Sequence, residues 1–367
     1  MEYYVGLDVH CKQTVYVLQN DEGRVLKEGS IPTTVEGLGQ LVKELKLPKD
    51  TPIGLETGAQ ANWVAQQLGA RSMQPFVINA KEVRQKARRL GQKTDRRDAF
   101  EICDGLRREI YISIVWVPGE GIERLRKILS RRRHFVRIST RQITAVKYLL
   151  RSAGISYTRL LLNRQAGWRR LFGRAEVTPL REHLEMHEAM WRLARANVQQ
   201  LEQELVEALQ PFAETMNLLT TVSGVALITA ATYIATLGTP HRFPTSGHAV
   251  SYVGLAPSTY DSGEREIRGQ ITKQGSPDLR AALCEAAHHA HRATHPLNPY
   301  YNRIAAKQGY KRAIVAVSQR LARILYQMWK KNEAFDVRKL NVVHQPQTLS
   351  KTVYYQIRKE PPKALAS

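Results

Sequence analysis

The chain has 367 residues, of which 43% are hydrophobic, and 55 Lys or Arg against 33 Asp or Glu give it a net charge of +22. This length predicts at least two domains with separate cores, and so large a charge predicts a polyanionic partner. Three scattered cysteines without a CxxC pair argue against a disulfide framework and a zinc site. Because no signal peptide or membrane-spanning run is found, we expect a cytoplasmic protein with no membrane contact.

The first hundred residues predict a mixed α/β domain, in which turn residues separate alternating strands and helices. In chain order we expect strands at 3–8, 14–20 and 25–31, a helix between Thr34 and Pro48, a strand at 52–57, a helix at 63–68, a strand at 75–79 and a basic helix at 80–90. This βββαβαβα order is found in RNase H-like folds, where parallel strands follow an antiparallel meander.

The rest of the chain is predicted to be mainly helical. An Arg-dense helix is expected at 123–150, and a helix from Thr178 to Pro211 has the alternating three-and-four apolar spacing of a coiled-coil arm or bundle helix, which suits dimerisation. Helices at 226–236, 279–292 and 311–331 then form a small second domain around a stretch punctuated by Gly and Pro. The predicted divisions are 1–110, 111–212, 213–335 and a tail at 336–367.

Four acids lie where predicted strands and helices meet. Asp8 ends the first strand, Glu56 ends the fourth, and Asp95 with Asp98 lies at the start of the helix after the fifth. Because strand C-termini of a parallel sheet gather at one edge, these carboxylates can converge there. Oxygen ligands favour Mg²⁺ or Mn²⁺ over zinc, and two such ions can activate a nucleophile at a phosphodiester. Taken singly, Asp8 could instead be a turn residue and Asp95 or Asp98 a helix cap.

One serine stands in a segment suited to attack on phosphorus. Ser262 precedes a glycine in the stretch YVGLAPSTYDSGEREIRGQITKQGSPDLR, residues 252–280, and basic residues follow it. Such a serine needs an exposed backbone and cations that neutralise the pentavalent state. The residue that would take its proton stays open. Ser223 and Ser246, which also precede glycines, are interpreted as helix caps.

Basic residues are concentrated between Lys81 and Arg151, where 20 Lys or Arg face 8 Asp or Glu, more than half of the net charge. Cations at this density suit phosphate backbones, although the run of three arginines at 131–133 could equally be a solvated helix face. The candidate phosphate contacts are Arg88, Arg89, Lys93, Arg96, Arg97, Arg131, Arg132, Arg133, Arg265, Arg268 and Lys273.

Four blocks, GLDVH, LETG, KTDRRDA and the stretch around Ser262, together resemble the DEDD-type insertion-sequence transposases, the bridge-RNA-guided recombinases. The resemblance runs from Tyr3 to about Lys331. It implies an α/β plus α fold: an N-terminal RNase H-like (RuvC-like) domain, long coiled-coil helices and a small, mostly helical C-terminal transposase domain that carries the serine. It makes Ser262 the nucleophile, and it makes the following acids the set that binds Mg²⁺ or Mn²⁺: Asp8, Glu56, Asp95 and Asp98.

The same resemblance implies an activity and partners. DNA strands would be cleaved and exchanged through a phosphoserine link, at a site that combines one subunit's carboxylates with another's serine. The partners would be donor and target DNA, a structured noncoding guide RNA that pairs with both, and further copies of the chain, as a dimer or as a tetramer in the synaptic complex. Such a protein would be bacterial and nucleoid-associated.

Three alternatives remain open at this stage. A Holliday-junction resolvase-like nuclease would use the carboxylates without a serine nucleophile. A noncatalytic nucleic-acid-binding protein would use the acids only as caps. An actin-like sugar kinase also begins with a strand and an acidic turn, but the sequence lacks a second meander domain and Gly-rich phosphate loops.

Overall fold

The structure is a computed structural model of the chain, and it describes residues 2–86, 94–157, 161–262, 265–336 and 338. The chain divides into two compact units, Met1–Gly119 and Glu120–Ser367, and each is described by itself. The division into three domains and a tail stays a prediction. None of the described helices is both long enough and apolar enough to cross a bilayer.

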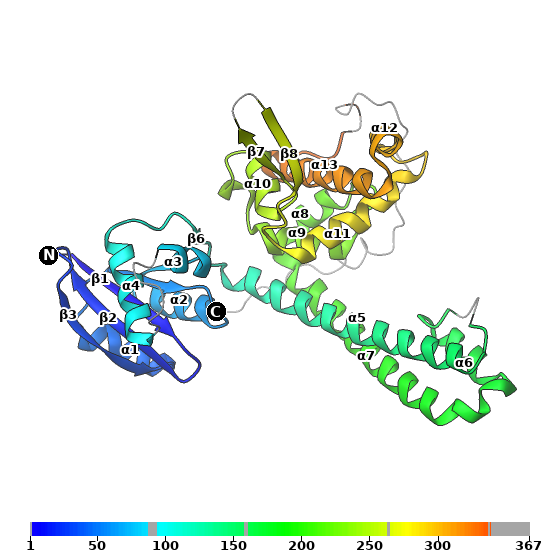
Figure 1. Ribbon diagram of the computed structural model, residues 1–367, viewed down its shortest axis with the longest axis horizontal. Helices are drawn as coiled ribbons and strands as arrows, with labels where there is room; N and C mark the ends of the chain where they lie inside the picture. The colour runs from blue at the N-terminus through cyan, green and yellow to red at the C-terminus, as the bar shows by residue number, and fades with distance from the viewer. Residues whose placement is uncertain (1, 87–93, 158–160, 263–264, 337, 339–367) are drawn as a thin grey trace. The chain divides into compact units, whose positions relative to one another are not determined.

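A six-stranded sheet of order β3-β2-β1-β4-β5-β6 forms the centre of the first unit (Figure 1). Its strands are β1 (Tyr3–Val9), β2 (Gln13–Asn20), β3 (Val25–Pro32), β4 (Pro52–Glu56), β5 (Gln74–Ile78) and β6 (Ile114–Val115). The first three strands pair antiparallel, and β4 pairs parallel with both β1 and β5. The meander and the parallel strands are as predicted, and this mixed α/β topology fits an RNase H-like DEDD domain. The short edge strand β6, antiparallel to β5, was not predicted.

Two helices cover one face of this sheet, namely α1 (Val35–Glu44) and α2 (Ala61–Gly69). Thr34 caps α1 as predicted, since its side chain accepts a hydrogen bond from the Gly37 amide at 3.0 Å. The buried core between these helices and the sheet is apolar and contains Val5, Leu7, Leu38, Leu41, Ile53, Leu55, Val64 and Leu68. The predicted basic helix at 80–90 appears as α3 (Ala80–Lys86), and its remaining residues lie outside the described part of the chain.

The helix α4 (Asp95–Arg107) packs against β1, β2 and β4. Its close approach depends on two glycines. A Cβ atom on Gly6 would overlap the carbonyl oxygen of Ala99, and one on Gly54 would lie 2.9 Å from Cγ2 of Ile102. Because side chains alternate along a strand, the residues two positions after these glycines also face α4. Those residues are Asp8 and Glu56.

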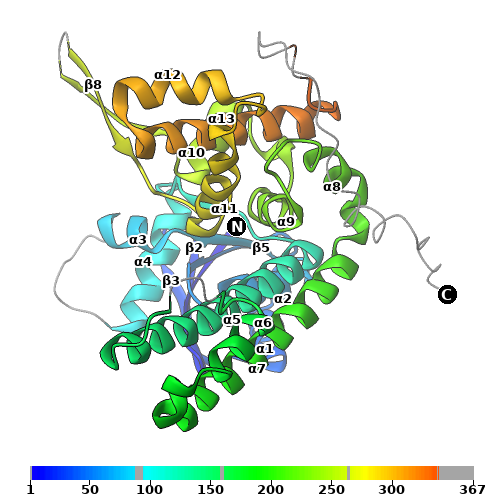
Figure 2. The same cartoon turned by 90° about the vertical axis from the view of Figure 1, so that its right-hand side faces the viewer.

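The second unit contains an antiparallel hairpin of two long helices, α5 (Glu120–Ser152) and α7 (Arg181–Ala208), which lie side by side in Figures 1 and 2. The predicted helix from Thr178 begins instead as a 3₁₀ turn, Ala175–Leu180, before α7. The α7 positions with coiled-coil spacing are buried as a stripe: Leu184, Trp191, Ala194, Val198, Leu205 and Ala208. Their packing partner α5 belongs to the same chain, so a dimer through this helix stays a prediction.

Beyond the hairpin lie α8 (Ala213–Leu219), α9 (Leu227–Leu237), α10 (Ser246–Val253), the two-stranded hairpin of β7 (Pro257–Ser262) and β8 (Arg265–Ile271), α11 (Pro277–His288), α12 (Asn298–Gln308) and α13 (Tyr310–Lys331). The helix predicted at 279–292 ends at His288 and continues as a short 3₁₀ turn. The helix α12 and the hairpin of β7 and β8 were not predicted. Between α5 and α7 a further short helix, α6 (Gln165–Phe172), buries Trp168 and Leu171.

Candidate active site

The strand register brings two of the four predicted acids to the same place on the sheet. Leu7 in β1 is the parallel partner of Leu55 in β4, so the next residues, Asp8 and Glu56, lie beside each other at the carboxyl ends of their strands. Both face α4, whose close approach depends on Gly6 and Gly54. The register therefore brings these two acids to one sheet edge, on the α4 face, and the joint site of all four acids stays a prediction.

The first turn of α4 brings the other two acids to the same edge. Asp95 is the first residue of the helix and Asp98 lies three residues later, so both are on neighbouring parts of one helix face. The interpretation of these acids as helix caps is wrong, because Thr94 is the cap and its side chain accepts from the Arg97 amide at 3.3 Å. Acids in a first helical turn are stabilised by the helix dipole, which offsets part of their mutual repulsion.

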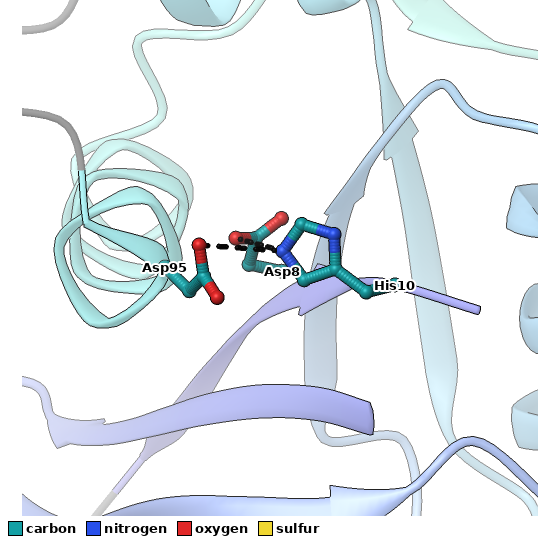
Figure 3. Close-up of side chains that lie close together, drawn as sticks. All are labelled: Asp8, His10 and Asp95. Atoms are coloured by element: carbon teal, nitrogen blue, oxygen red, sulfur yellow. Dashed lines mark hydrogen bonds and ion pairs between the residues drawn. The ribbon is translucent and has the colours of Figure 1, made fainter. Parts of the chain in front are cut away.

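A histidine joins the acids (Figure 3). The Nε2 atom of His10 lies 3.1 Å from Oδ2 of Asp8 and 3.4 Å from Oδ1 of Asp95. One ligand atom from each of these three residues lies within 4.8 Å of the others, which is close enough for one cation to contact all three. Glu56 and Asp98 are not part of this closest group. His10 was not among the predicted site residues, although its place two residues after Asp8 in GLDVH is a usable signal.

The Asp8 carboxylate is the buried member of the group, with 8% of its side chain exposed against 57% for Asp95. Burial raises the pKa of Asp8 above its ordinary value, the His10 ring lowers this pKa in part, and the Asp98 and Asp95 carboxylates raise it again. A carboxyl group in this position is costly to ionise unless a positive charge compensates it. A buried acid, Asp8, an exposed acid, Asp95, and the imidazole of His10 therefore surround one point. Asp98, which lies on the same helix as Asp95, is close enough to raise the pKa of Asp8.

This donor set fits a divalent cation. Carboxylate oxygens are the ligands that Mg²⁺ and Mn²⁺ prefer, and an imidazole nitrogen among them is accepted more readily by Mn²⁺. The identity of the ion and the roles of the individual acids stay proposals.

Ser262 ends β7 in the second unit and pairs in register with Arg265 at the start of β8. The two residues between them lie outside the described part of the chain, and so do the side chains of Ser262, Arg265 and Arg268. Lys273, after the hairpin, is exposed and has a positive φ of 56°.

The two serines interpreted as helix caps do not hold those positions. The cap of α9 is Ala226, and the main-chain oxygen of Ser223 instead lies 3.1 Å from Nε2 of His295. The cap residue of α10 is Thr245, and Ser246 is the first helical residue. Neither serine has the capping bond that the sequence suggested.

Several of the candidate phosphate contacts make ion pairs within the chain. The Nε and Nη2 atoms of Arg96 lie 2.8 and 2.7 Å from the carboxylate oxygens of Glu28, and Arg132 pairs with Glu202 of α7 at 2.6 Å. Arg133 pairs with Asp278. These three arginines therefore have a structural role that the sequence did not indicate. Arg131 is exposed, Arg97 is half-buried, and the remaining N-terminal candidates, Arg88, Arg89 and Lys93, lie outside the described residues.

Two family models match the chain. One, of the DEDD type of IS110 and described as a transposase, matches residues 5–155 and so includes all four acids. The other is described as "Transposase IS116/IS110/IS902 family" and matches residues 216–302, which include Ser262. Between them the two matches include part of each compact unit.

Similar proteins of known name agree with these matches. The chain is 24% identical to "Transposase for insertion sequence element IS1111A" of Coxiella burnetii over 259 residues, which are 66% of this chain and 68% of that protein. It is 25% identical to "Putative transposase y4qE" of Sinorhizobium fredii over 293 residues, 78% of this chain and 71% of the relative. It is 25% identical to "Probable family 20 transposase" of Pseudomonas aeruginosa over 206 residues, 54% and 59% of the two chains. The chain is therefore similar to insertion-sequence transposases over part of each compact unit.

Proposed function

We propose that this chain is the transposase of a bacterial insertion sequence, which cleaves and exchanges DNA strands with a carboxylate metal site and a serine nucleophile. The observation that carries the proposal is the meeting of Asp8 with the first turn of α4 at the carboxyl edge of a sheet with RNase H-like topology. The matches to transposase families over both units, and the transposase names of the relatives, point to the same activity.

In this proposal the metal-binding residues are Asp8, Glu56, Asp95 and Asp98. A bound Mg²⁺ or Mn²⁺ would stabilise the negative charge that develops on the phosphate and on the leaving oxygen. The close approach of α4 to β1 and β4 at Gly6 and Gly54 supports this assignment. His10 hydrogen-bonds Asp8 from the solvent side, and we propose that it positions that carboxylate or contributes a nitrogen ligand.

The proposed reaction also includes a covalent bond between Ser262 and DNA. The Ser262 hydroxyl oxygen forms a bond to phosphorus, one bond from that phosphorus to a deoxyribose oxygen breaks, and the serine proton leaves to a base. The support is the position of Ser262 at the end of β7, next to the hairpin turn, inside the segment that matches the transposase family model. The carboxylates and the serine come from different compact units, so we propose that the site is assembled from two copies of the chain. A noncoding guide RNA that pairs with donor and target DNA completes the proposed complex.

The experiment that tests this function is recombination in vitro. Purified protein, a labelled donor carrying the element's ends, a labelled target and the noncoding RNA transcribed from the element's flank are mixed with Mg²⁺. Joined donor and target strands are expected with the unchanged chain, and none with Asp8→Asn. A Ser262→Ala protein that still cuts DNA in a metal-dependent way, without joining strands, would instead favour the nuclease alternative.

A further inference from the structure

The C-terminal helices contain a stretch without any acid. Between Glu285 and Glu333 the chain has 47 residues with nine Lys or Arg and no Asp or Glu. At the content of the whole chain, 33 acids in 367 residues, a stretch of this length would hold about four. Most of it forms α12 and α13, which lie side by side in Figure 2.

The two helices bury their apolar faces and direct cations outwards. Ala313, Val317 and Leu321 of α13 are fully or almost fully buried. On the polar side, Arg303 and Lys307 are four residues apart on α12, and both are exposed. Arg320 and Arg323 are three residues apart on α13. Residues at these spacings lie on the same helix face, so each helix carries a pair of neighbouring cations.

One tyrosine joins the two helices within this surface. The Arg303 guanidinium carbon lies 5.3 Å from the centroid of the Tyr300 ring, and the Arg320 guanidinium carbon lies 4.9 Å from the same centroid. Both distances are within the range of a cation–π contact. A single half-buried ring thus holds two arginines, one from its own helix and one from the next.

This pair differs from three other arginines that the structure describes. Arg96, Arg107 and Arg132 each form an ion pair with a carboxylate at 2.6 to 2.7 Å. For Arg303 and Arg320, no described carboxylate lies within ion-pair distance. Arg320 also lines a pocket together with Glu333 and Asp336, so acids that follow α13 compensate part of its charge. An anion that contacts both guanidiniums would compensate more of it.

We propose that Arg303 and Arg320, held by Tyr300, form a clamp for the phosphodiester backbone of a nucleic acid. A guanidinium in contact with a ring still has N–H groups available, and a pair of these matches two phosphate oxygens. Lys307 and Arg323 extend the clamp along each helix as further phosphate contacts. This inference rests on the proposed function, because it is that function which puts the chain on nucleic acid rather than on another polyanion. Contacts of this kind read backbone charge and carry no base sequence.

The test is the salt dependence of binding by the full-length protein. A labelled 30-base-pair DNA duplex and a labelled RNA duplex of the same sequence are titrated separately between 50 and 300 mM salt. Because each neutralised phosphate contributes roughly 0.9 to the log–log slope on B-DNA, Arg303→Gln with Arg320→Gln should make the slope about 2 units less negative and weaken binding about 10-fold. A loss on the DNA arm, the RNA arm or both supports the clamp and tells which backbone it holds.

Two further variants distinguish the geometry of the clamp from the effect of its positive charge alone. Arg303→Lys with Arg320→Lys keeps both charges, so the slope should stay as in the unchanged chain while affinity falls a few-fold, because lysine binds phosphate as a point charge. Tyr300→Leu should likewise leave the slope unchanged and lower the affinity a few-fold, since the cations remain but lose their fixed geometry. The charge-matched control is Arg24→Gln with Lys43→Gln, two exposed cations of the first unit, which should leave the slope unchanged.

Thermal unfolding of every variant shows whether the fold is intact, and the lysine pair serves as the test if the glutamine pair unfolds. An unaltered slope in Arg303→Gln with Arg320→Gln on both duplexes, or a change equal to that of the control, overturns the clamp. If that happens while the same protein still recombines DNA, only the clamp is wrong. If the unchanged chain binds neither duplex, the proposed function has failed as well.

Discussion

Gly6 lies directly against Ala99, so that any side-chain carbon on the glycine would overlap the Ala99 carbonyl oxygen and lie 2.8 Å from Cβ of Cys103. Helix α4 can reach Asp8 only because β1 offers no side chain at this point. Gly6→Ala should therefore push α4 outwards, cost about 1–3 kcal/mol of folding free energy as overpacking and displace Asp95 and Asp98. Urea unfolding and a strand-cleavage assay measure the two effects.

Gly69→Ala provides the matched control, because Gly69 is the last residue of α2 and nothing lies within 4 Å of an added Cβ. This variant should keep full cleavage and remain within about 1 kcal/mol of the unchanged chain. Equal stability and equal cleavage in Gly6→Ala and Gly69→Ala would show that the seating of α4 does not matter to the site.

Asp8→Asn, Glu56→Gln and Asp98→Asn should each abolish strand cleavage and leave most nucleic-acid affinity unchanged, because the lost function is metal ligation. Among them Asp8→Asn has an additional effect on stability. The pKa of Asp8 is raised in the fold, so its favourable contribution is complete below the ordinary pKa of about 4 and is lost as the pH rises through the raised value. At pH 7 without metal, Asp8→Asn should consequently unfold at a higher temperature than the unchanged chain.

Added Mg²⁺ or Mn²⁺ should reverse this order. An ion bound to the folded chain at 100 times its dissociation constant stabilises it by about 2.7 kcal/mol, whereas Asp8→Asn should gain little. Calorimetric scans in EDTA and in excess metal provide the comparison. A metal-dependent rise in melting temperature that is the same in both proteins would mean that the ion binds somewhere else, and three acid variants that recombine normally would end the carboxylate proposal altogether.

We expect His10 to affect activation of the site by Mn²⁺ more than activation by Mg²⁺. If its Nε2 atom serves as a ligand between Asp8 and Asp95, His10→Ala should weaken Mn²⁺ activation more than Mg²⁺ activation, by about 10-fold or more, because nitrogen ligands favour Mn²⁺. The measurement is the half-saturating concentration of each metal in the cleavage assay. Equal losses for both ions would leave His10 as a residue that positions Asp8, and an unchanged response to both would remove it from the site.

Arg131 and Arg132 are neighbours in sequence, yet they should respond differently to the same substitution. Arg131 is exposed, whereas Arg132 pairs with Glu202 across the helical hairpin. Arg131→Gln should make the log–log salt slope of DNA binding less negative by roughly 0.9 and leave stability alone. Arg132→Gln should leave the slope alone and cost about 1 kcal/mol, since its partner is half exposed. Reversed results would assign the phosphate contact to Arg132.

Ser262→Ala should eliminate any covalent protein–DNA product, and Ser262→Cys should retain at most a trace, because the thiol differs in geometry and leaving-group behaviour. Ser223→Ala and Ser246→Ala are the controls, and as neither serine makes a capping bond, each should change stability by no more than about 0.5 kcal/mol. Denaturing electrophoresis of labelled DNA reveals the product. A protein-linked band that survives Ser262→Ala and disappears in one of the controls would move the nucleophile to that serine.

The sequence predicted the sheet well because its strands have strong local signals. The tripeptides Gly6-Leu7-Asp8 and Gly54-Leu55-Glu56 show why the site follows from the same pattern. In each, the leucine enters the core beneath α1 and α2, and the glycine and the acid face α4. Alternation along two paired strands was therefore enough to indicate the convergence of two acids, although the repeated Gly-Leu-acid pattern itself was overlooked.

Other features depend on contacts between distant residues, which no local pattern encodes. The ion pair of Arg132 with Glu202 joins positions 70 apart and exists only once α5 and α7 have adopted their register. The place of His10 depends on the turn after β1, where its amide donates to the Gln13 oxygen at 3.1 Å. The start of α12, by contrast, could have been predicted, because Pro299 in its first turn is a known start signal of helices.

The number of residues in α5 and α7 fixes the length of the arm that these two helices form. With a rise of 1.5 Å per residue, the 33 residues of α5 extend about 50 Å, and seven residues correspond to about 10 Å. Because the buried stripe of α7 repeats with coiled-coil spacing, removing one heptad from α5 and the facing heptad from α7 would keep the packing and shorten the arm by two turns. One heptad thus corresponds in length to about three base pairs of duplex DNA. If the spacing between two DNA sites depends on the length of the hairpin, that spacing should change by about three base pairs for each heptad removed.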